Sequence, residues 1–260
     1  MRGWWQDLTD LVLPAECGGC GRSRTVLCPE CRAALSGAAP RRVRPVPEPP
    51  GLPEVHAAAP YGDEVRAALL AHKERGALTL AGALGTALAG AVRAAAAGPE
   101  GGPVLLVPVP SARRAVRARG HDPVRRIALA AAGELRRVGT PARVVAVLRQ
   151  RRAVADQSGL DSRRRLENLA GALEVRAGGA RLLGGGRPVL VDDLITTGAS
   201  LTEAARAVRH ALVHEGGRTA VYAHPTREEM GERMAGSTRG TVVRAAVIAA
   251  PPDSFETNRN

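Results

Sequence analysis

Short, uninterrupted apolar runs alternate with stretches of helical periodicity along most of the chain. Runs of this kind are typical of strands buried on both faces of a parallel sheet, and the periodic stretches indicate helices packed on it. The pattern predicts strands at 55–61, 104–110, 144–148, 189–191, 219–223 and 242–249. It predicts helices at 62–72, 78–92 and 127–135, one entered near Ser162 and one opening at Leu201. The expected fold class is therefore α/β, a mostly parallel twisted sheet flanked by helices.

Polar residues cluster in segment 187–200, between a predicted strand and a predicted helix. Asp192 and Asp193 directly follow the strand, where open α/β sheets bind ligands, and carboxylates there suit sugar hydroxyls or a hydrated Mg²⁺. A loop of small residues then opens the helix: Thr196, Thr197, Gly198, Ala199 and Ser200. Because free N–H groups at a helix N-terminus favour an anion, the segment predicts a site for a phosphorylated sugar. An ordinary capped helix with solvated acids is the alternative interpretation.

Arginine-dense segments follow the predicted strands at 104–110 and 144–148. The first strand ends in a Pro-containing turn, which can present backbone N–H groups to an anion while neighbouring arginines add bidentate donors. A solvated basic helix face is the alternative for that segment. The second segment is polar, lacks a helical period in its first half, and predicts a loop that enters the helix near Ser162.

All four cysteines of the chain lie within fifteen residues near the N-terminus, as two CxxC pairs. They are Cys17, Cys20, Cys28 and Cys31. This spacing suits tetrahedral Zn²⁺ ligation by four thiolates, and a site closed by four protein ligands is structural and not catalytic. Unligated surface thiols are the alternative. Clustering of this kind favours a metal site over a disulfide framework, and it also favours a reducing compartment.

Composition shifts along the chain predict four parts. Residues 1–35 would form the four-cysteine module, 36–53 a Pro- and Arg-rich linker, 54–250 the main domain and 251–260 a disordered tail. We expect no membrane span, because no apolar stretch of about twenty residues stands out. The first residues also lack the features of a signal peptide, so the expected location is the cytoplasm.

The charge balance is strongly basic, with a formal net charge of +12 and a pI of 11.1. Such a balance favours polyanions or phosphorylated small molecules as partners, although a general arginine bias on a solvated surface would also produce it. Lys73 is the single lysine.

The stretch VLVDDLITTGAS resembles the phosphoribosyl-pyrophosphate (PRPP) motif of type I phosphoribosyltransferases. The resemblance implies that Asp192 and Asp193 contact the ribose hydroxyls as the catalytic acids. It implies that the loop from Thr196 to Ser200 holds the 5′-phosphate and that Mg²⁺ binds together with PRPP. The expected fold is then the type I phosphoribosyltransferase fold, and the expected reaction is phosphoribosyl transfer to an acceptor with release of pyrophosphate.

Further elements in the same order are similar to the competence-protein-F-like (ComF) family, over roughly residues 10–250. They are the four cysteines, KERG at 73–76, VPVP at 107–110, RARGHD at 117–122 and the 157–168 segment. This resemblance implies a pyrophosphate site built from the turn and nearby arginines, with a closing loop at 149–165. The residues assigned to it are Pro108, Val109, Pro110, Ser111, Arg117, Arg119 and Arg165, with Lys73 as a roof or second-subunit contact.

Three functions stay open on the sequence alone. The first is a PRPP-dependent transferase, and the second is a PRPP-sensing regulator on the same fold. The third is an accessory protein for DNA uptake that binds single-stranded DNA or the uptake machinery. The basic stretches contain no interleaved aromatic residues that could stack on bases, which counts against the third. A homodimer is compatible with each of them.

Overall fold

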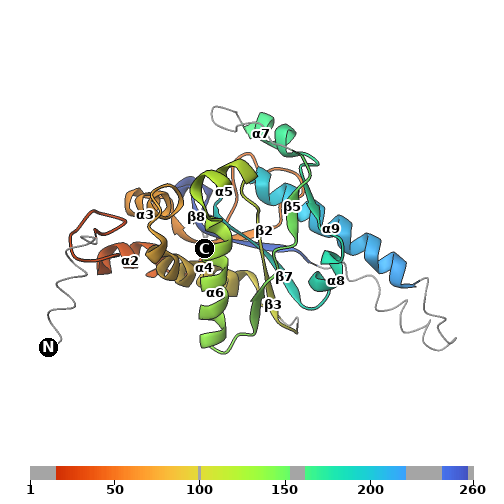
Figure 1. Cartoon of the computed structure of the whole chain (residues 1–260), viewed down its shortest axis with the longest axis horizontal. Helices are drawn as coiled ribbons and strands as arrows, with labels where there is room; N and C mark the ends of the chain where they lie inside the picture. The colour runs from red at the N-terminus through yellow and green to blue at the C-terminus, as the bar shows by residue number, and fades with distance from the viewer. Residues whose placement is uncertain (1–15, 99–100, 153–161, 221–241, 257–260) are drawn as a thin grey trace.

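The computed structural model describes residues 16–98, 101–152, 162–220 and 242–256 (Figure 1). The strands are β1 (Arg41–Val43), β2 (Glu54–Pro60), β3 (Val104–Pro108), β4 (Ala142–Val144), β5 (Leu148–Gln150), β6 (Leu173–Val175), β7 (Arg187–Leu194) and β8 (Arg244–Ala250). The helices are α2 (Pro29–Ser36), α3 (Asp63–Glu74), α4 (Ala81–Ala95), α5 (Arg113–Arg119), α6 (Pro123–Arg137), α7 (Ser162–Leu169), α8 (Gly179–Leu183) and α9 (Ala199–Ala220), with 3₁₀ turns η1 (Leu78–Leu80) and η2 (Pro252–Ser254).

Six of the strands form one sheet in the order β1-β2-β8-β7-β3-β4. Every neighbouring pair runs parallel except β1 and β2 at one edge, which are antiparallel. The predicted α/β class with a mostly parallel sheet is confirmed in this coarse form. β7 and β3 lie side by side in the middle of the sheet, so the loops that follow these two strands open at the same sheet edge.

Helices cover both faces of the sheet (Figure 1). Alternate residues of β8 supply the two apolar clusters: Ala246 and Ile248 belong to the cluster under α2, α3, α4 and α6, whereas Ala245 and Val247 belong to the cluster under α9. This is the period of two expected for a strand buried on both faces. The apolar runs of the sequence therefore mark the centre of the sheet.

Small residues compensate for the near absence of aromatic side chains in this core. Only 2% of the chain is aromatic. Helices α4 and α6 approach so closely at Gly85 that a Cβ atom there would lie 2.5 Å from Cβ of Ala130. Close backbone approach thus fills the space that larger side chains occupy in other cores.

The described part of the four-cysteine segment and the predicted linker both pack against the main sheet and its helices. Helix α2 contacts α3, α4 and β2, and its Leu35 is buried in the apolar cluster beneath them. The region assigned to the linker contributes strand β1, in which Val43 pairs with Val55 of β2. The Pro-rich composition at 36–53 obscured this strand, because it is only three residues long.

The predicted strand at 144–148 is split in the structure. Strand β4 ends at Val144, and Val147 N–H donates to the carbonyl of Val145 at 2.9 Å, so the chain turns away from the sheet there. It continues as β5, which forms an antiparallel hairpin with β6 outside the main sheet. The uniform apolar character of this segment hides the turn.

Two predictions near the C-terminus are wrong. Residues 219–220, assigned to a strand, are the end of helix α9, and residues 221–223 lie outside the described part of the chain. The expected disordered tail begins with ordered residues. Phe255 forms a β-bridge with Val43, and the guanidinium of Arg41 lies 4.6 Å from the centre of its ring.

One described stretch, Leu78–Ala95, is long and apolar enough to cross a membrane by length and composition, which corrects the expectation that no such stretch exists. More than half of it is buried within the protein. It forms η1 and α4, and α4 packs against β2, β8 and α6. Its apolar character is therefore accounted for by the core.

Candidate functional site

The four cysteines form a compact cluster at the start of α2. Their sulfur atoms all lie within 4.8 Å of one another, and none of the four is in a disulfide. Sγ of Cys20 is 3.7 Å from Sγ of Cys28, close to the spacing of about 3.8 Å that a tetrahedron with 2.3 Å zinc–sulfur bonds requires. The cluster could therefore hold a metal ion such as zinc.

Backbone donors support the charged form of Cys17, whereas the pKa values of Cys28 and Cys31 are raised above the ordinary value, that of Cys31 mainly by burial. Cys28 N–H donates to Sγ of Cys17 at 3.3 Å, and Cys31 N–H donates to Sγ of Cys28 at 3.5 Å. Burial works to raise the pKa of Cys17, but hydrogen bonds from several backbone N–H groups outweigh it and lower this pKa to about 6. Thiolates are the form that ligates a metal.

A second site lies at the carboxyl ends of β3 and β7. It is a cavity of about 700 Å³, which we call the strand-end cavity. The residues that define it come from four segments: Lys73 of α3; Val109, Pro110 and Ser111 after β3; Asp192 and Asp193 of β7; Thr196 and Ser200 around the start of α9. The topology thus brings together residues up to about 120 positions apart.

The two carboxylates differ in environment. Asp193 is buried, and its Oδ2 accepts a hydrogen bond from Nζ of Lys73 at 2.9 Å. Asp192 is half-buried, and its Oδ1 accepts from the N–H of Asp193 at 2.9 Å. Burial and then the adjacent Asp193 charge raise the pKa of Asp192 well above its usual range. Desolvation works to lower the pKa of Lys73, but the charge of Asp193 and its hydrogen bond raise this pKa above the ordinary value.

The loop at 196–200 is shaped by Gly198, whose φ of +78° favours glycine. A Cβ atom at this position would lie 3.0 Å from Cδ1 of Leu52, so the loop also packs against the segment before β2. The backbone N–H of Ala199 approaches Oγ1 of Thr197 at 3.5 Å, and Thr202 N–H donates to the carbonyl of Gly198 to begin α9. Of the loop residues, Thr196 and Ser200 line the strand-end cavity, whereas Gly198 and Ala199 are buried and are not among its lining residues.

The residues assigned to a pyrophosphate site separate into two groups. Val109, Pro110 and Ser111 line the strand-end cavity as expected. Arg117 lines a neighbouring cavity, which Pro108 also lines.

Arg119 is engaged by Glu74, with its Nη2 and Nε at 2.7 and 2.9 Å from the two carboxylate oxygens. Arg165 belongs to α7, but its side chain lies outside the described atoms, as does the whole of segment 153–161. The structure therefore describes only the two ends of the predicted closing loop at 149–165, which lie in β5 and the following two residues and in α7.

Two polar residues that line the strand-end cavity were not assigned to a site from the sequence. They are Arg114, from α5, and Gln150, at the end of β5. Arg114 is one of several arginines in a dense run of the sequence. Only the position at which α5 begins distinguishes Arg114 from Arg117 and Arg119. Gly120, which has a left-handed backbone conformation with φ of +73°, ends α5. This glycine was the one local feature of the sequence that indicated where α5 lies.

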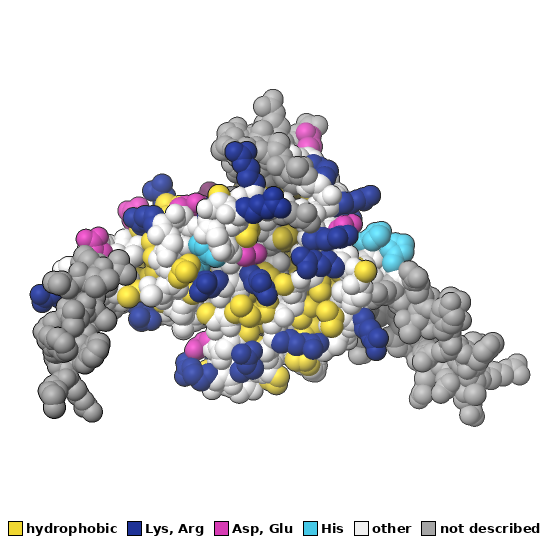
Figure 2. Space-filling view, in the orientation of Figure 1, with side chains coloured by type: hydrophobic (Ala, Val, Ile, Leu, Met, Phe, Trp, Pro, Cys, Tyr) yellow, Lys and Arg dark blue, Asp and Glu magenta, His cyan; other side chains and the backbone are white. Residues whose placement is uncertain are grey.

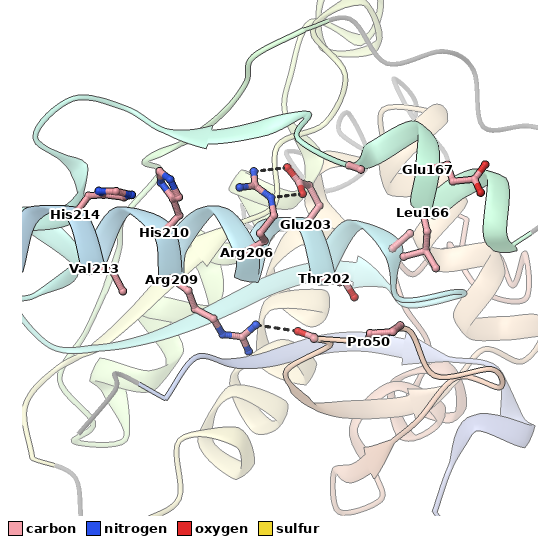
Figure 3. Close-up of a pocket in the computed structure, with 13 residues that line it drawn as sticks. Pro50, Leu166, Glu167, Thr202, Glu203, Arg206, Arg209, His210, Val213 and His214 are labelled. Atoms are coloured by element: carbon pink, nitrogen blue, oxygen red, sulfur yellow. Dashed lines mark hydrogen bonds and ion pairs between the residues drawn. The ribbon is translucent and has the colours of Figure 1, made fainter. Parts of the chain in front are cut away.

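A third cavity, of about 760 Å³, runs along α9 beside α7 (Figure 3). Within it, the buried carboxylate of Glu203 accepts from Leu173 N–H at 2.9 Å and from Arg206, which in turn donates to the carbonyl of Leu173. Arg209 donates to the carbonyl of Gly51 at 2.9 Å. Figure 3 shows the side chains of Arg206 and Arg209 directed toward their partners within the protein. They attach α9, which begins at Ala199, to the hairpin and to the segment before β2.

No protein-family model matches the chain, and no curated protein matches it significantly. The structure itself shows an α/β protein with a mostly parallel sheet, a four-cysteine candidate metal centre and a cavity at the strand ends that two carboxylates line.

Proposed function

We propose that the protein is a phosphoribosyltransferase-like member of the ComF family that binds PRPP with Mg²⁺ in the strand-end cavity. The proposed reaction is transfer of the phosphoribosyl group to an acceptor with release of pyrophosphate. A volume of about 700 Å³ falls in the range of small-molecule sites.

One observation supports this proposal above the others. Two carboxylates at the end of β7, two hydroxyls at the opening of α9 and the Val109–Ser111 turn all line a single cavity. These are the three chemistries that PRPP needs, for its ribose hydroxyls, its 5′-phosphate and its pyrophosphate. An ordinary capped helix would need only the second of them.

Each group has a role that follows from its chemistry. The ribose hydroxyls would donate to the carboxylates of Asp192 and Asp193, while Thr196 and Ser200 would donate to the 5′-phosphate together with free N–H groups of the first turn of α9. Arg114 would take the part assigned to Arg117 and Arg119, because it lines this cavity together with the turn and they do not. Positioning and charge stabilisation would then carry most of the rate enhancement.

The residues present fit Mg²⁺ bound through its substrate. Mg²⁺ keeps several waters and takes one or two carboxylates plus phosphate oxygens. Asp192 and Asp193 are the described carboxylates that line this cavity, and the proposed pyrophosphate turn from Val109 to Ser111 lines it as well. Bound in this way, Mg²⁺ would neutralise part of the pyrophosphate charge.

Thermal unfolding with different ligands tests the proposal. PRPP with Mg²⁺ at a hundredfold excess over its Kd should stabilise the protein by about 2.7 kcal/mol, which corresponds to about 5–10 °C for a protein of this size. Ribose 5-phosphate and pyrophosphate should each give less than half of that shift, because each fills only part of the cavity. An equal shift with pyrophosphate alone would contradict the proposal, since it would report a general anion effect.

The transferase and the PRPP-sensing regulator share this cavity and differ in turnover. Release of pyrophosphate from bound PRPP in the presence of an acceptor marks the transferase. The DNA-uptake alternative rests on the four-cysteine module, the net charge of +12 and the family resemblance, and it uses no feature of the strand-end cavity.

A further inference from the structure

Four arginines from separate segments surround a cavity of about 470 Å³ next to the strand-end cavity. We call it the arginine cavity, defined by Arg117 of α5, Arg125 of α6, Arg149 of β5 and Arg176 just after β6. Basic side chains are frequent over α5, α6 and the hairpin in the view of Figure 2. The fold thus concentrates positive charge at a concave surface.

Most of this charge is not neutralised within the protein. Arg149 pairs with Glu174 at 2.8 Å, but the guanidinium groups of Arg117, Arg125 and Arg176 form no hydrogen bond or ion pair with any described residue. Asp122 is the one acid among the described residues that line the cavity, and its carboxylate caps α6 by accepting from Arg125 N–H at 3.1 Å. Three like charges around one hollow repel one another, and an anion placed among them removes that cost.

The lining also has an apolar part. Val116, Ala146 and Leu148 contribute to it, while Ser111 and Gln150 add a hydroxyl and an amide. A bare phosphate would leave the apolar wall unused. The lining therefore matches a molecule that joins an anionic group to an apolar, ring-sized body.

We propose that the arginine cavity binds an organic phosphate of the class of a nucleoside monophosphate, at a site separate from the strand-end cavity. The volume suits a small molecule. A nucleic acid strand would need an extended basic track with aromatic stacking platforms, and no aromatic side chain is among the described residues that line this cavity. Pro110, Ser111 and Gln150 line both cavities, so ligands in the two sites would contact the same wall.

This inference goes beyond the proposed function, because it requires neither PRPP nor turnover. The test is a titration of the full-length protein with AMP at fixed ionic strength. Arg125→Gln and Arg176→Gln should each weaken AMP binding at least tenfold, because each removes an unpaired guanidinium. Arg181→Gln is the matched control, since Arg181 is an exposed arginine of α8 outside this cavity, and it should change the Kd less than twofold.

Two further probes separate the outcomes. Inorganic phosphate should bind at least tenfold more weakly than AMP, and the double variant Asp192→Asn, Asp193→Asn should keep AMP binding, which distinguishes this site from the PRPP site. The proposal is overturned if AMP at millimolar concentration does not bind, or if all three arginine variants lose binding alike. If a single-stranded oligonucleotide binds more tightly than AMP, and all three variants lose equal oligonucleotide affinity, the arginines serve nucleic acid binding instead.

Discussion

Replacing Cys31 with serine should abolish zinc binding by the four-cysteine cluster and lower the melting temperature of the zinc-loaded protein by about 8–16 °C. When free zinc exceeds its Kd a thousandfold, binding to the folded state alone contributes about 4 kcal/mol of stability. For a protein of this size each kcal/mol corresponds to about 2–4 °C. Cys31 is 2% exposed and lies in the same apolar cluster as α3 and α4, so loss of the site also loosens the docking of α2. Thermal unfolding and metal content measured on the same samples check this prediction.

The matched control changes a charged residue in the same module. Arg22→Gln breaks the Arg22–Glu30 pair, whose atoms are 2.9 Å apart, but both side chains are more than half exposed. Exposed pairs contribute at most about 1 kcal/mol, so this variant should keep its zinc and nearly all of its stability. A Cys31→Ser variant that unfolds at the wild-type temperature, or a wild type that contains no metal after purification with zinc, would contradict a structural metal site.

Lys73→Met should cost about 2 kcal/mol of unfolding free energy at pH 8. Breaking a buried ion pair leaves an uncompensated charge, here Asp193, and the cost is smaller than for a fully buried pair because the Lys73 side chain is 34% exposed. The pKa of Asp192 is already raised by burial and by Asp193, and loss of the cation should raise this pKa further. An acid with a raised pKa in the folded state loses stability as pH rises above its unfolded value, so the deficit should be larger at pH 8 than at pH 5. Urea unfolding at the two pH values measures it.

Two variants show whether charge pairing is the cause. Lys73→Arg keeps the cation and should lose less than half as much stability as Lys73→Met. Combining Lys73→Met with Asp193→Asn should cost clearly less than the sum of the two single changes, because the pair is broken only once. Strict additivity would show that Lys73 acts through packing of its stem. At the alkaline end, the raised pKa of Lys73 means that its contribution is present below about pH 10 and is lost as pH rises through the folded-state pKa.

The sheet could be predicted because its strands carry their signal locally. Val104 to Val107 and Val189 to Val191 are buried on both faces of the sheet. Their uninterrupted apolar sequence indicates this burial even when the neighbouring strands are unknown. The same holds for the four cysteines, whose spacing predicts the compact cluster that the structure shows, and for Asp192 and Asp193, which lie at the carboxyl end of buried strand β7 and line the strand-end cavity.

Long-range pairing could not be predicted in this way. The Lys73–Asp193 bond spans 120 positions, and the Arg119–Glu74 pair joins α5 to α3 across 45. The spacing of the arginines does not reveal that Arg119 pairs with Glu74. It also does not reveal that Arg114 lines the strand-end cavity while Arg117 lines the arginine cavity. Likewise β1 has three residues in a Pro-rich stretch, and its strand character comes from the exposed edge of β2 that it pairs with. Tertiary context decides such elements, and local propensity does not.

Calorimetric titration of PRPP with Mg²⁺ into the wild type and into the double variant Asp192→Asn, Asp193→Asn tests the central claim most directly. The account predicts a Kd near 1 μM for the wild type, about −8 kcal/mol, and a loss of at least a hundredfold in the double variant. Asp253→Asn, which removes an exposed carboxylate in η2, should bind like the wild type. An absence of binding to the folded, metal-loaded wild type, or equal affinity in the double variant, would contradict PRPP recognition by the strand-end cavity.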